Sequence, residues 1–329
     1  MKIIQKTAVA LAALLLFGVC GCGISQEPKT LTVFAMDTVV TLTAYGENAG
    51  PALDAAVQKL NEYDAALDVD SGDIGNINSH AGEFVEVSAE VYQLLSDCVR
   101  ISRQTDGAFD VTVGKYIELW GFRSQTRIPS QEELAGAAAF VGWEKIEFSD
   151  GKVKIPKGMQ LDLGGIAKGW AAGKLKEVLT ENGVKSAVLS LGGNVTTLGK
   201  KPDGTSFHIA IRDPEDESAY IDTVEVSDLA VVTSGSYIRY FELNGVRYHH
   251  IIDPETGQPA ESGQSAGSGQ SAGSGLVSVT VICADNTAAD AYSTAFFVMG
   301  KEKTSGFLEN HPEIKVILVT ADGEIIRIN

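Results

Sequence analysis

Segments with a helical hydrophobic period and segments with a strand period follow one another along this chain without a regular βαβ alternation. The helical period predicts helices over residues 51–63, 89–105, 131–140, 166–182 and 286–298. The alternating period predicts a strand or strand pair over residues 31–46, short strands within 143–163, strands over 186–191, 207–212, 221–227, 231–234, 237–243, 248–252 and 276–283, and a hairpin over 314–328. A doubly wound parallel sheet needs strands and helices in strict succession, so this order predicts the α+β class.

The size and the charge of the chain limit its function. Its 329 residues, 44% of them hydrophobic, are enough for a large core. A formal net charge of −17 repels nucleic acid and argues against a basic membrane-binding patch. The four cysteines, at positions 20, 22, 98 and 283, have neither zinc-site spacing nor the pattern of a disulfide framework.

Residues 1–22 are similar to a bacterial lipoprotein signal peptide. Lys2 and Lys6 frame a basic start, and the apolar run over residues 8–19 is too short for a comfortable membrane span. The run ends in VCGC, where Cys22 follows a small glycine and is the expected site of lipid attachment. An ordinary secretory signal is the alternative. Both predict an extracytoplasmic protein; the first predicts one lipid-anchored to the cell membrane, with residues 23–30 as a polar tether.

One internal segment differs from the rest in composition. Residues 262–275 read SGQSAGSGQSAGSG and have no apolar side chain larger than alanine. Such a sequence cannot contribute to a core and is typical of a flexible linker. A natural repeat expansion and an engineered insertion would both give this composition.

The stretch LDLGGIAKGWAAGKL (residues 161–175) places a glycine pair and Lys168 at the start of a predicted helix. Glycines let a backbone approach a ligand closely, and a helix N-terminus favours phosphate. The spacing matches neither the Rossmann nor the Walker pattern. Taken alone, a tight turn with a surface lysine explains it equally well.

Two further stretches carry polar groups with potential chemistry. In ADNTAADAYSTAFFVMG (residues 284–300), Asp290 and Thr294 are four residues apart and share one helical face, where both could reach a hard cation. A dipole-favoured acid and a back-bonded threonine are the simpler explanation of that spacing. In YHHIIDPETG (residues 248–257), His249 and His250 would point to opposite faces of a strand, so at most one can enter a given pocket.

The motifs are more informative together than singly. In chain order they are Met36-Asp37-Thr38, TDGAFDVTVG with ELWGF, DLGGIAKGW, SLGGN, TSGSYIRYF, YHHIIDPETGQP and ADAYSTAFFVMG. This set resembles the ApbE family of FAD:protein FMN transferases over nearly all of residues 31–329. The resemblance implies a single transferase domain with a mixed α/β fold of antiparallel sheets and packed helices.

The resemblance also implies a site. It implies Mg²⁺ ligands at Asp290, Thr294 and the carbonyl of Gly165, and an active-site histidine at His250, with His249 facing away. The implied FAD contacts are Met36, Ala108, Phe109, Asp110, Asp162, Lys168 and Ser293. With Asp290 and His250 as the catalytic pair, FMN would pass from FAD to a Thr or Ser hydroxyl of an acceptor flavoprotein, a membrane redox subunit or an extracellular flavoprotein, releasing AMP.

Two alternatives to transfer remain at this point, an FAD pyrophosphatase giving FMN and AMP and a non-catalytic FAD-binding lipoprotein. Whether His250 or a carboxylate takes the proton of the acceptor hydroxyl is also open. The chain departs from the family pattern at Asp37, where many members have glycine, and at Gly173, where they often have aspartate. The segment 67–78 is shorter than the usual FAD-flanking one.

Overall fold

The computed structural model describes residues 27–216, 218–260 and 275–329. The predicted leader, Cys22, most of the tether and nearly all of the 262–275 repeat therefore lie outside the described residues. Within the described part, no helix is long and apolar enough to cross a membrane. Cys98 and Cys283 are both buried and free.

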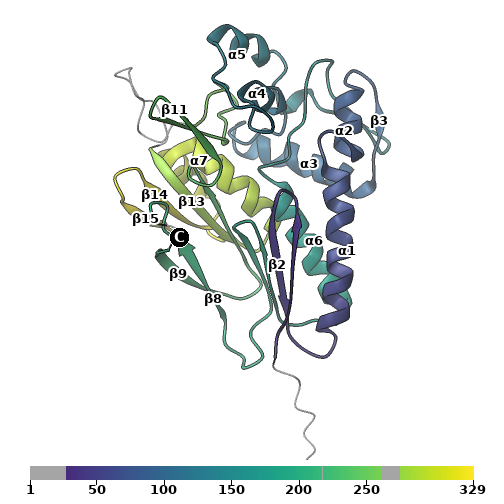
Figure 1. Ribbon diagram of the computed structural model, residues 1–329, viewed down its shortest axis with the longest axis vertical. Helices are drawn as coiled ribbons and strands as arrows, with labels where there is room; N and C mark the ends of the chain where they lie inside the picture. The colour runs from purple at the N-terminus through teal and green to yellow at the C-terminus, as the bar shows by residue number, and fades with distance from the viewer. Residues whose placement is uncertain (1–26, 217, 261–274) are drawn as a thin grey trace, which may run out of the picture.

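An antiparallel sheet forms the centre of the fold (Figure 1). Its strands are, in order across the sheet, β1 (Lys29–Ala35), β2 (Thr38–Ala44), β6 (Ala187–Leu191), β7 (Asn194–Leu198), β10 (Ala230–Gly235), β13 (Leu276–Cys283), β14 (Lys315–Thr320) and β15 (Ile325–Ile328). Each neighbouring pair is antiparallel. This confirms the α+β class with antiparallel sheets.

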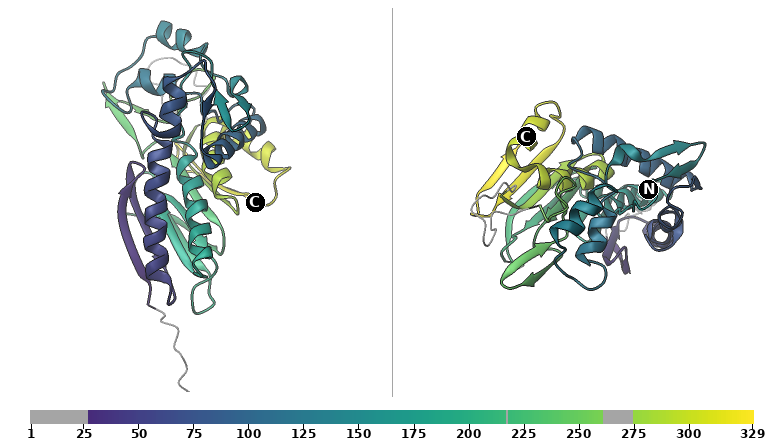
Figure 2. Two further views of the ribbon diagram at one scale, coloured as in Figure 1. Left: turned by 90° about the vertical axis from the view of Figure 1, so that its right-hand side faces the viewer. Right: turned by 90° about the horizontal axis from the view of Figure 1, so that it is seen from above.

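Both faces of this sheet are covered. Val232, Val281 and Leu318 point to the main core. The helices that pack on the sheet in this core include α1 (Ala49–Leu67), α6 (Ala167–Glu181) and α7 (Asn286–Leu308). The sequence neighbours of those three strand residues, Val231, Ile282 and Ile317, point to the opposite face of the sheet. They pack against the hairpin of β8 (Phe207–Arg212) and β9 (Tyr220–Val226). Burial on both faces explains why β13 is an almost continuous apolar run. Figure 2 shows α1 and α6 side by side along the strands.

The remaining elements gather at one end of the molecule, above the sheet in Figure 1. They are α2 (Gly72–Ser79), β3 (Val85–Glu86), α3 (Ala89–Gln104), α4 (Gly114–Trp120), α5 (Gln131–Ala138), a 3₁₀ turn (Trp143–Lys145), β4 (Glu147–Ser149), β5 (Lys152–Lys154), β11 (Tyr240–Leu243) and β12 (Val246–His249). A second small core joins α4, α5 and the β11–β12 hairpin.

Trp120 is the centre of that second core. It is fully buried, its indole N–H donates to the carbonyl of Gly257 (2.8 Å), and its ring lies 5.5 Å from that of Tyr248 on β12. A buried indole must find such an acceptor. Trp120 therefore fixes both the β11–β12 hairpin and the DPETG turn that follows it.

The structure adds elements that the sequence patterns did not predict. Helix α2 contains two glycines and two asparagines, which are poor helix formers, and it is held by the burial of Ile74 and Ile77. Helix α4 and strand β7 were also missed. Two predicted strands are displaced: 237–243 begins at Tyr240, and 248–252 ends at His249. Helix α7 extends to Leu308 across a break at Gly300, close to its predicted end.

Helices α6 and α7 approach closely at a glycine. A Cβ added to Gly169 would lie 2.5 Å from the Cβ of Asp290 and would overlap the carbonyl oxygen of Asn286. At Gly173, one turn further along α6, an added Cβ would make only ordinary contacts, 3.5 Å from the side chain of Asn286. The first glycine is a packing requirement and the second is not.

We therefore expect Gly169→Ala to lower the free energy of unfolding by roughly 1–3 kcal/mol, because the two helices must separate. The matched control Gly173→Ala should leave it unchanged or raise it by up to about 1 kcal/mol, since alanine favours a helix. Urea denaturation of the two variants tests this. Equal effects of the two substitutions would contradict the close crossing.

Candidate active site

The strand-to-helix turn before α6 is fixed from two sides. The side chain of Asn78 on α2 bonds both backbone groups of Leu161, accepting from its N–H (2.7 Å) and donating to its carbonyl (3.1 Å). One residue further, the N–H of Asp162 donates to the carbonyl of Val111 (2.7 Å). These bonds hold the backbone of the turn in which Gly165 comes close to Thr294 of α7.

Asp290 lies on α7 opposite this turn. It is only 3% exposed, and its Oδ2 accepts the backbone N–H of Gly169 (2.8 Å) and lies 4.0 Å from the ammonium of Lys168. Within the described part of the chain, no residue donates a hydrogen bond to its other oxygen, Oδ1. A buried carboxylate is costly unless it is well paired, so this oxygen is suited to a cation.

The other two predicted ligands, Thr294 and Gly165, lie near one another. The hydroxyl of Thr294 donates to the backbone carbonyl of Asp290 at 3.4 Å. A Cβ placed on Gly165 would be 3.1 Å from the same hydroxyl. The buried ring of Phe109 is close to the same position, 3.4 Å from a Cβ placed on Gly165. Gly165 and Thr294 are thus neighbours, and Thr294 lies one turn after Asp290 on α7. A carboxylate with neutral hydroxyl and carbonyl oxygens would be a donor set that suits a hard cation.

The two histidines occupy different environments. His249 is buried, its Nε2 bonds the carbonyl of Ala260 (2.7 Å), and burial lowers its pKa to about 4. His250 follows the end of β12, and its Nδ1 lies 3.0 Å from the carbonyl of Arg239. A carbonyl only accepts, so this contact places the proton on Nδ1 and leaves the lone pair on Nε2. Desolvation lowers the pKa of His250 to about 3, and the positive charge of nearby Lys168 acts in the same direction.

Other predicted FAD contacts have internal partners. Asp110 is buried; its Oδ1 accepts from the N–H and hydroxyl of Thr112 (both 2.7 Å) and its Oδ2 from the N–H of Trp143 (3.0 Å). Desolvation raises the pKa of Asp110. Ser293 is fully buried, with its hydroxyl shared between the Asp290 carbonyl and Ser234. Both side chains stabilise the walls of the site from within.

The predicted contacts nearer the surface are differently placed. Met36 is partly buried in the two-residue turn between β1 and β2, where it and Asp37 both have positive φ, 51° and 57°. Ala108 is partly buried beside Phe109. The carboxylate of Asp162 accepts the N–H of Gly164 (2.7 Å) and forms an ion pair with Arg123.

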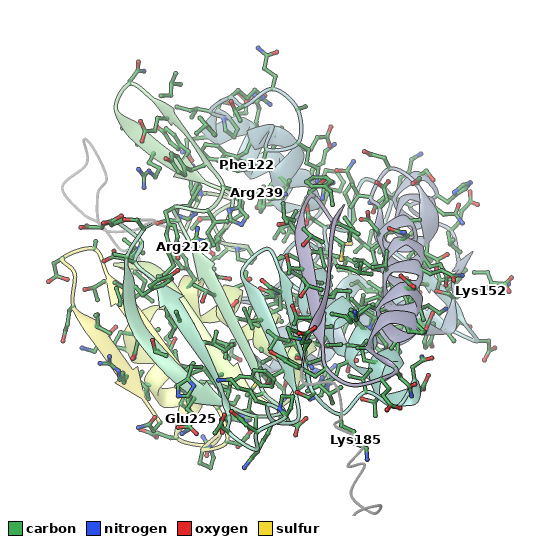
Figure 3. All side chains as sticks on the ribbon, turned by 60° about the horizontal axis from the view of Figure 1, so that its bottom comes forward. Phe122, Lys152, Lys185, Arg212, Glu225 and Arg239 are labelled. Atoms are coloured by element: carbon green, nitrogen blue, oxygen red, sulfur yellow. The ribbon has the colours of Figure 1, made fainter. Side chains whose placement is uncertain are left out.

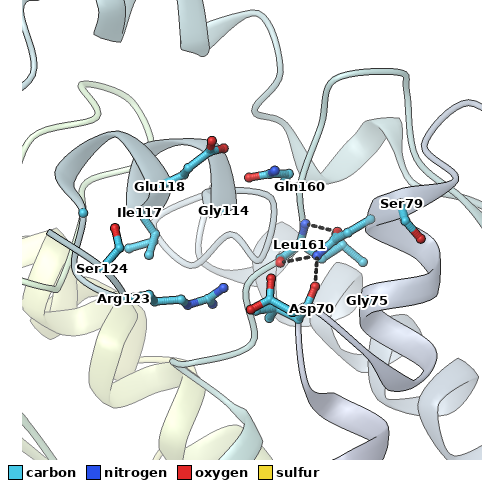
Figure 4. A pocket seen from close by; sticks show the side chains of 13 residues that line it. Asp70, Gly75, Ser79, Gly114, Ile117, Glu118, Arg123, Ser124, Gln160 and Leu161 are labelled. Carbon is cyan, nitrogen blue, oxygen red and sulfur yellow. Dashed lines mark hydrogen bonds between the residues drawn. The ribbon is translucent and has the colours of Figure 1, made fainter.

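Arg123 also lines a cavity of about 490 Å³ (Figure 4). Its walls come from α2, α4 and the segment before α6: Val69, Asp70, Gly75, Asn78, Ser79, Gly114, Ile117, Glu118, Gly121, Arg123, Ser124, Gln160 and Leu161. The short 67–78 segment, which departs from the family pattern, thus forms one wall. A cavity of this size suits a small-molecule ring system.

Sequence reasoning did not single out Arg123, Arg239, Ser234 or Asn78. Ser234 and Arg239 stand within the TSGSYIRYF motif, and Arg123 directly follows ELWGF, so the motifs contained the signal without a role for each residue. Asn78 acts through backbone bonds to a segment 83 residues away, for which the sequence holds no local sign.

Comparison with known proteins identifies this arrangement. The ApbE family matches residues 36–318. A Vibrio cholerae protein named FAD:protein FMN transferase is 32% identical, over 96% of this chain and 94% of its own. The crystal structure of the ApbE protein of Thermotoga maritima superposes with a TM-score of 0.83 at 33% identity, covering 92% of this chain and 97% of its own. The flavin transferase ApbE of Vibrio cholerae superposes with a TM-score of 0.79 at 28% identity, with 92% and 96% covered.

The protein is thus of the flavin-transferase class in fold and sequence. It belongs to the ApbE family.

Proposed function

We propose that this protein transfers FMN from FAD to a Thr or Ser hydroxyl of an acceptor flavoprotein and releases AMP. The observation that supports the proposal is the buried carboxylate of Asp290 with the ammonium of Lys168 4.0 Å from it, at the start of α6. Relatives named FAD:protein FMN transferase support the reaction class.

FAD would lie across the turn before α6. The cavity beside Arg123 would receive one ring system, and the pyrophosphate would pass Asp162 towards Lys168. Asp162 connects the two regions, because it pairs with Arg123 on the cavity wall and accepts the N–H of Gly164 beside Gly165. The N-terminal end of α6 adds a favourable field for phosphate oxygens.

We also propose that Asp290, Thr294 and the carbonyl of Gly165 hold Mg²⁺. No group of three or more acidic, histidine or cysteine side chains forms a metal site within residues 27–216, 218–260 and 275–329, so the set would rely on one carboxylate and neutral oxygens. Bound there, Mg²⁺ would neutralise charge on the pyrophosphate and on the departing AMP. Lys168 supplies a second positive charge near the same oxygens.

The protein's own residues account for the proton transfer. The acceptor hydroxyl attacks the FMN phosphorus, a new P–O bond forms, and the P–O bond to AMP breaks, with AMP leaving as the phosphate anion. Nε2 of His250 takes the hydroxyl proton, because Nδ1–H is engaged with the Arg239 carbonyl. The second core around Trp120 fixes the hairpin that carries His250 and so holds this nitrogen in place.

We place the protein outside the cytoplasm, lipid-anchored through Cys22, where it would meet a membrane redox subunit or an extracellular flavoprotein. The support is the signal-peptide pattern of residues 1–22. Membrane fractionation of a Cys22→Ser variant tests the lipid anchor. The anchor proposal is wrong if the variant protein stays in the membrane fraction and its mass shows no loss of a lipid group.

The central experiment incubates the protein with FAD, Mg²⁺ and a candidate acceptor and analyses the products by mass spectrometry. Asp290→Asn should abolish transfer, because it keeps an oxygen for the Gly169 N–H but removes the charge. His250→Ala should slow transfer by about 10²–10⁴-fold. Free FMN and AMP without a flavinylated acceptor would indicate a pyrophosphatase. Unchanged FAD that co-purifies would indicate a binder.

The pH dependence tests the role of His250 separately. In the free enzyme the pKa of His250, about 3, keeps the imidazole deprotonated between about pH 8 and 5. Protonation of His250 should therefore cause no decrease of kcat/KM over that range. The negative pyrophosphate raises the pKa in the complex, so kcat should decline at a higher pH than kcat/KM as the pH falls. Coincident acidic limbs near the ordinary histidine pKa would contradict this assignment.

A further inference from the structure

Large apolar side chains are exposed on two hairpins beside the site. In the described part of the chain, eight such side chains are clearly exposed, and five of them lie on these hairpins. Phe34 (73% exposed) and Val39 (59%) are on β1 and β2, and Ile238, Tyr240 and Leu243 (44–45%) are on or just before β11. Tyr240 and Leu243 are three residues apart on β11 and point to opposite faces of the hairpin. We therefore call Phe34, Val39, Ile238 and Tyr240 the apolar rim.

The two hairpins are joined at the site. The guanidinium of Arg239 donates to the carbonyl of Asp37 (3.3 Å) and lies 3.7 Å from its carboxylate. The carbonyl of the same Arg239 holds Nδ1 of His250. Figure 3 shows Arg239 at the base of the β11–β12 hairpin, where it meets the central sheet. Ile238 and Tyr240 flank Arg239 in the chain and so lie near the proposed catalytic base. The contact between Arg239 and Asp37 brings the turn next to Val39 to the same place.

The core does not require the rim. Phe34 and Val39 are directly opposite one another on β1 and β2, and strand alternation turns them away from the core, towards which the adjacent Ala35 (2% exposed) and Val40 (0%) point. Further along the same face the cross-strand pairs are threonines, such as Thr32 with Thr41. The apolar pair is thus confined to the end of the hairpin nearest the site. Clustered exposed apolar residues of this kind mark interaction surfaces.

We propose that the apolar rim is the docking surface for the folded acceptor flavoprotein. This rests on the proposed function, which requires an acceptor hydroxyl to come within hydrogen-bond reach of His250 Nε2. A protein that does so must cover the residues around His250, and the rim lies on the two hairpins that Arg239 joins beside His250. Arg239 and Asp37 offset one another's charge, so the surface is locally neutral on a chain with a net charge of −17.

The position of the rim favours the acceptor over a membrane as its occupant. The chain enters β1 at Lys29, and Phe34 is near the other end of that strand. A seven-residue strand is about 20 Å long. The expected anchor at Cys22 precedes Lys29, so the tether joins the domain at the end away from the rim. A lipid surface or a second copy on the rim would also block the acceptor's access to His250.

The test uses Phe34→Thr and Ile238→Thr, singly and combined. Both side chains are exposed, and threonine keeps the strand preference at position 34. The matched controls are Tyr220→Thr (66% exposed) and Phe84→Thr (44%), which remove equally exposed rings outside the rim. The probes are an acceptor domain that the wild-type protein has first been shown to flavinylate, and a short synthetic peptide containing its modified residue.

The combined variant should raise the KM for the folded acceptor by about tenfold, as expected for the loss of two interface side chains. The KM for FAD, FAD hydrolysis without acceptor and transfer to the peptide should not change, and the controls should match the wild type. An unchanged KM for the folded acceptor overturns the proposal. A parallel rise in the KM for FAD also overturns it. The proposal is likewise wrong if the substitutions change only the binding of the protein to vesicles or its self-association. If the wild type flavinylates no acceptor, the proposed function fails first and this inference fails with it.

Discussion

The hydrogen bond from the Gly169 N–H to the Asp290 carboxylate connects the fold of this protein to its chemistry. It forms only where α6 and α7 touch through a glycine, and it uses one carboxylate oxygen without neutralising the charge. The same crossing brings Lys168 to 4.0 Å from Asp290 and Gly165 close to Thr294. The sheet supports both helices, because β10 and β13 contact α7 while β6 and β7 contact α6.

The protein's own residues balance the charges of the site only in part. The buried carboxylate of Asp290 lies 4.0 Å from the ammonium of Lys168, and desolvation, together with the charge of the same lysine, lowers the pKa of His250. A dianionic pyrophosphate with a divalent cation would improve both situations, since it adds negative charge near Lys168 and His250 and positive charge near Asp290. Binding of nucleotide and metal should therefore be mutually favourable.

The spacing of hydrophobic residues along the chain predicted much of the fold. The long helices and most strands of the sheet appear where the pattern placed them, because their buried faces are regular. Helix α2 could not be predicted, since burial of Ile74 and Ile77 and the distant bonds of Asn78 to Leu161 hold a segment of poor helix formers. For the site, spacing alone favoured a structural role for Asp290 and Thr294, and only the family resemblance pointed to Gly165 as their partner. The tautomer of His250 depends on the Arg239 carbonyl, a contact that no local pattern encodes.

The account's central claim is that Asp290, Thr294 and Gly165 form a cation site that shares the pyrophosphate of FAD. Calorimetric binding of FAD to the wild-type protein, with Mg²⁺ present and again after its removal by a chelator, tests it most directly. The account predicts that Mg²⁺ tightens FAD binding by a factor of about 5 to 150, the usual range for two coupled ligands. Identical affinities in the two conditions would contradict it.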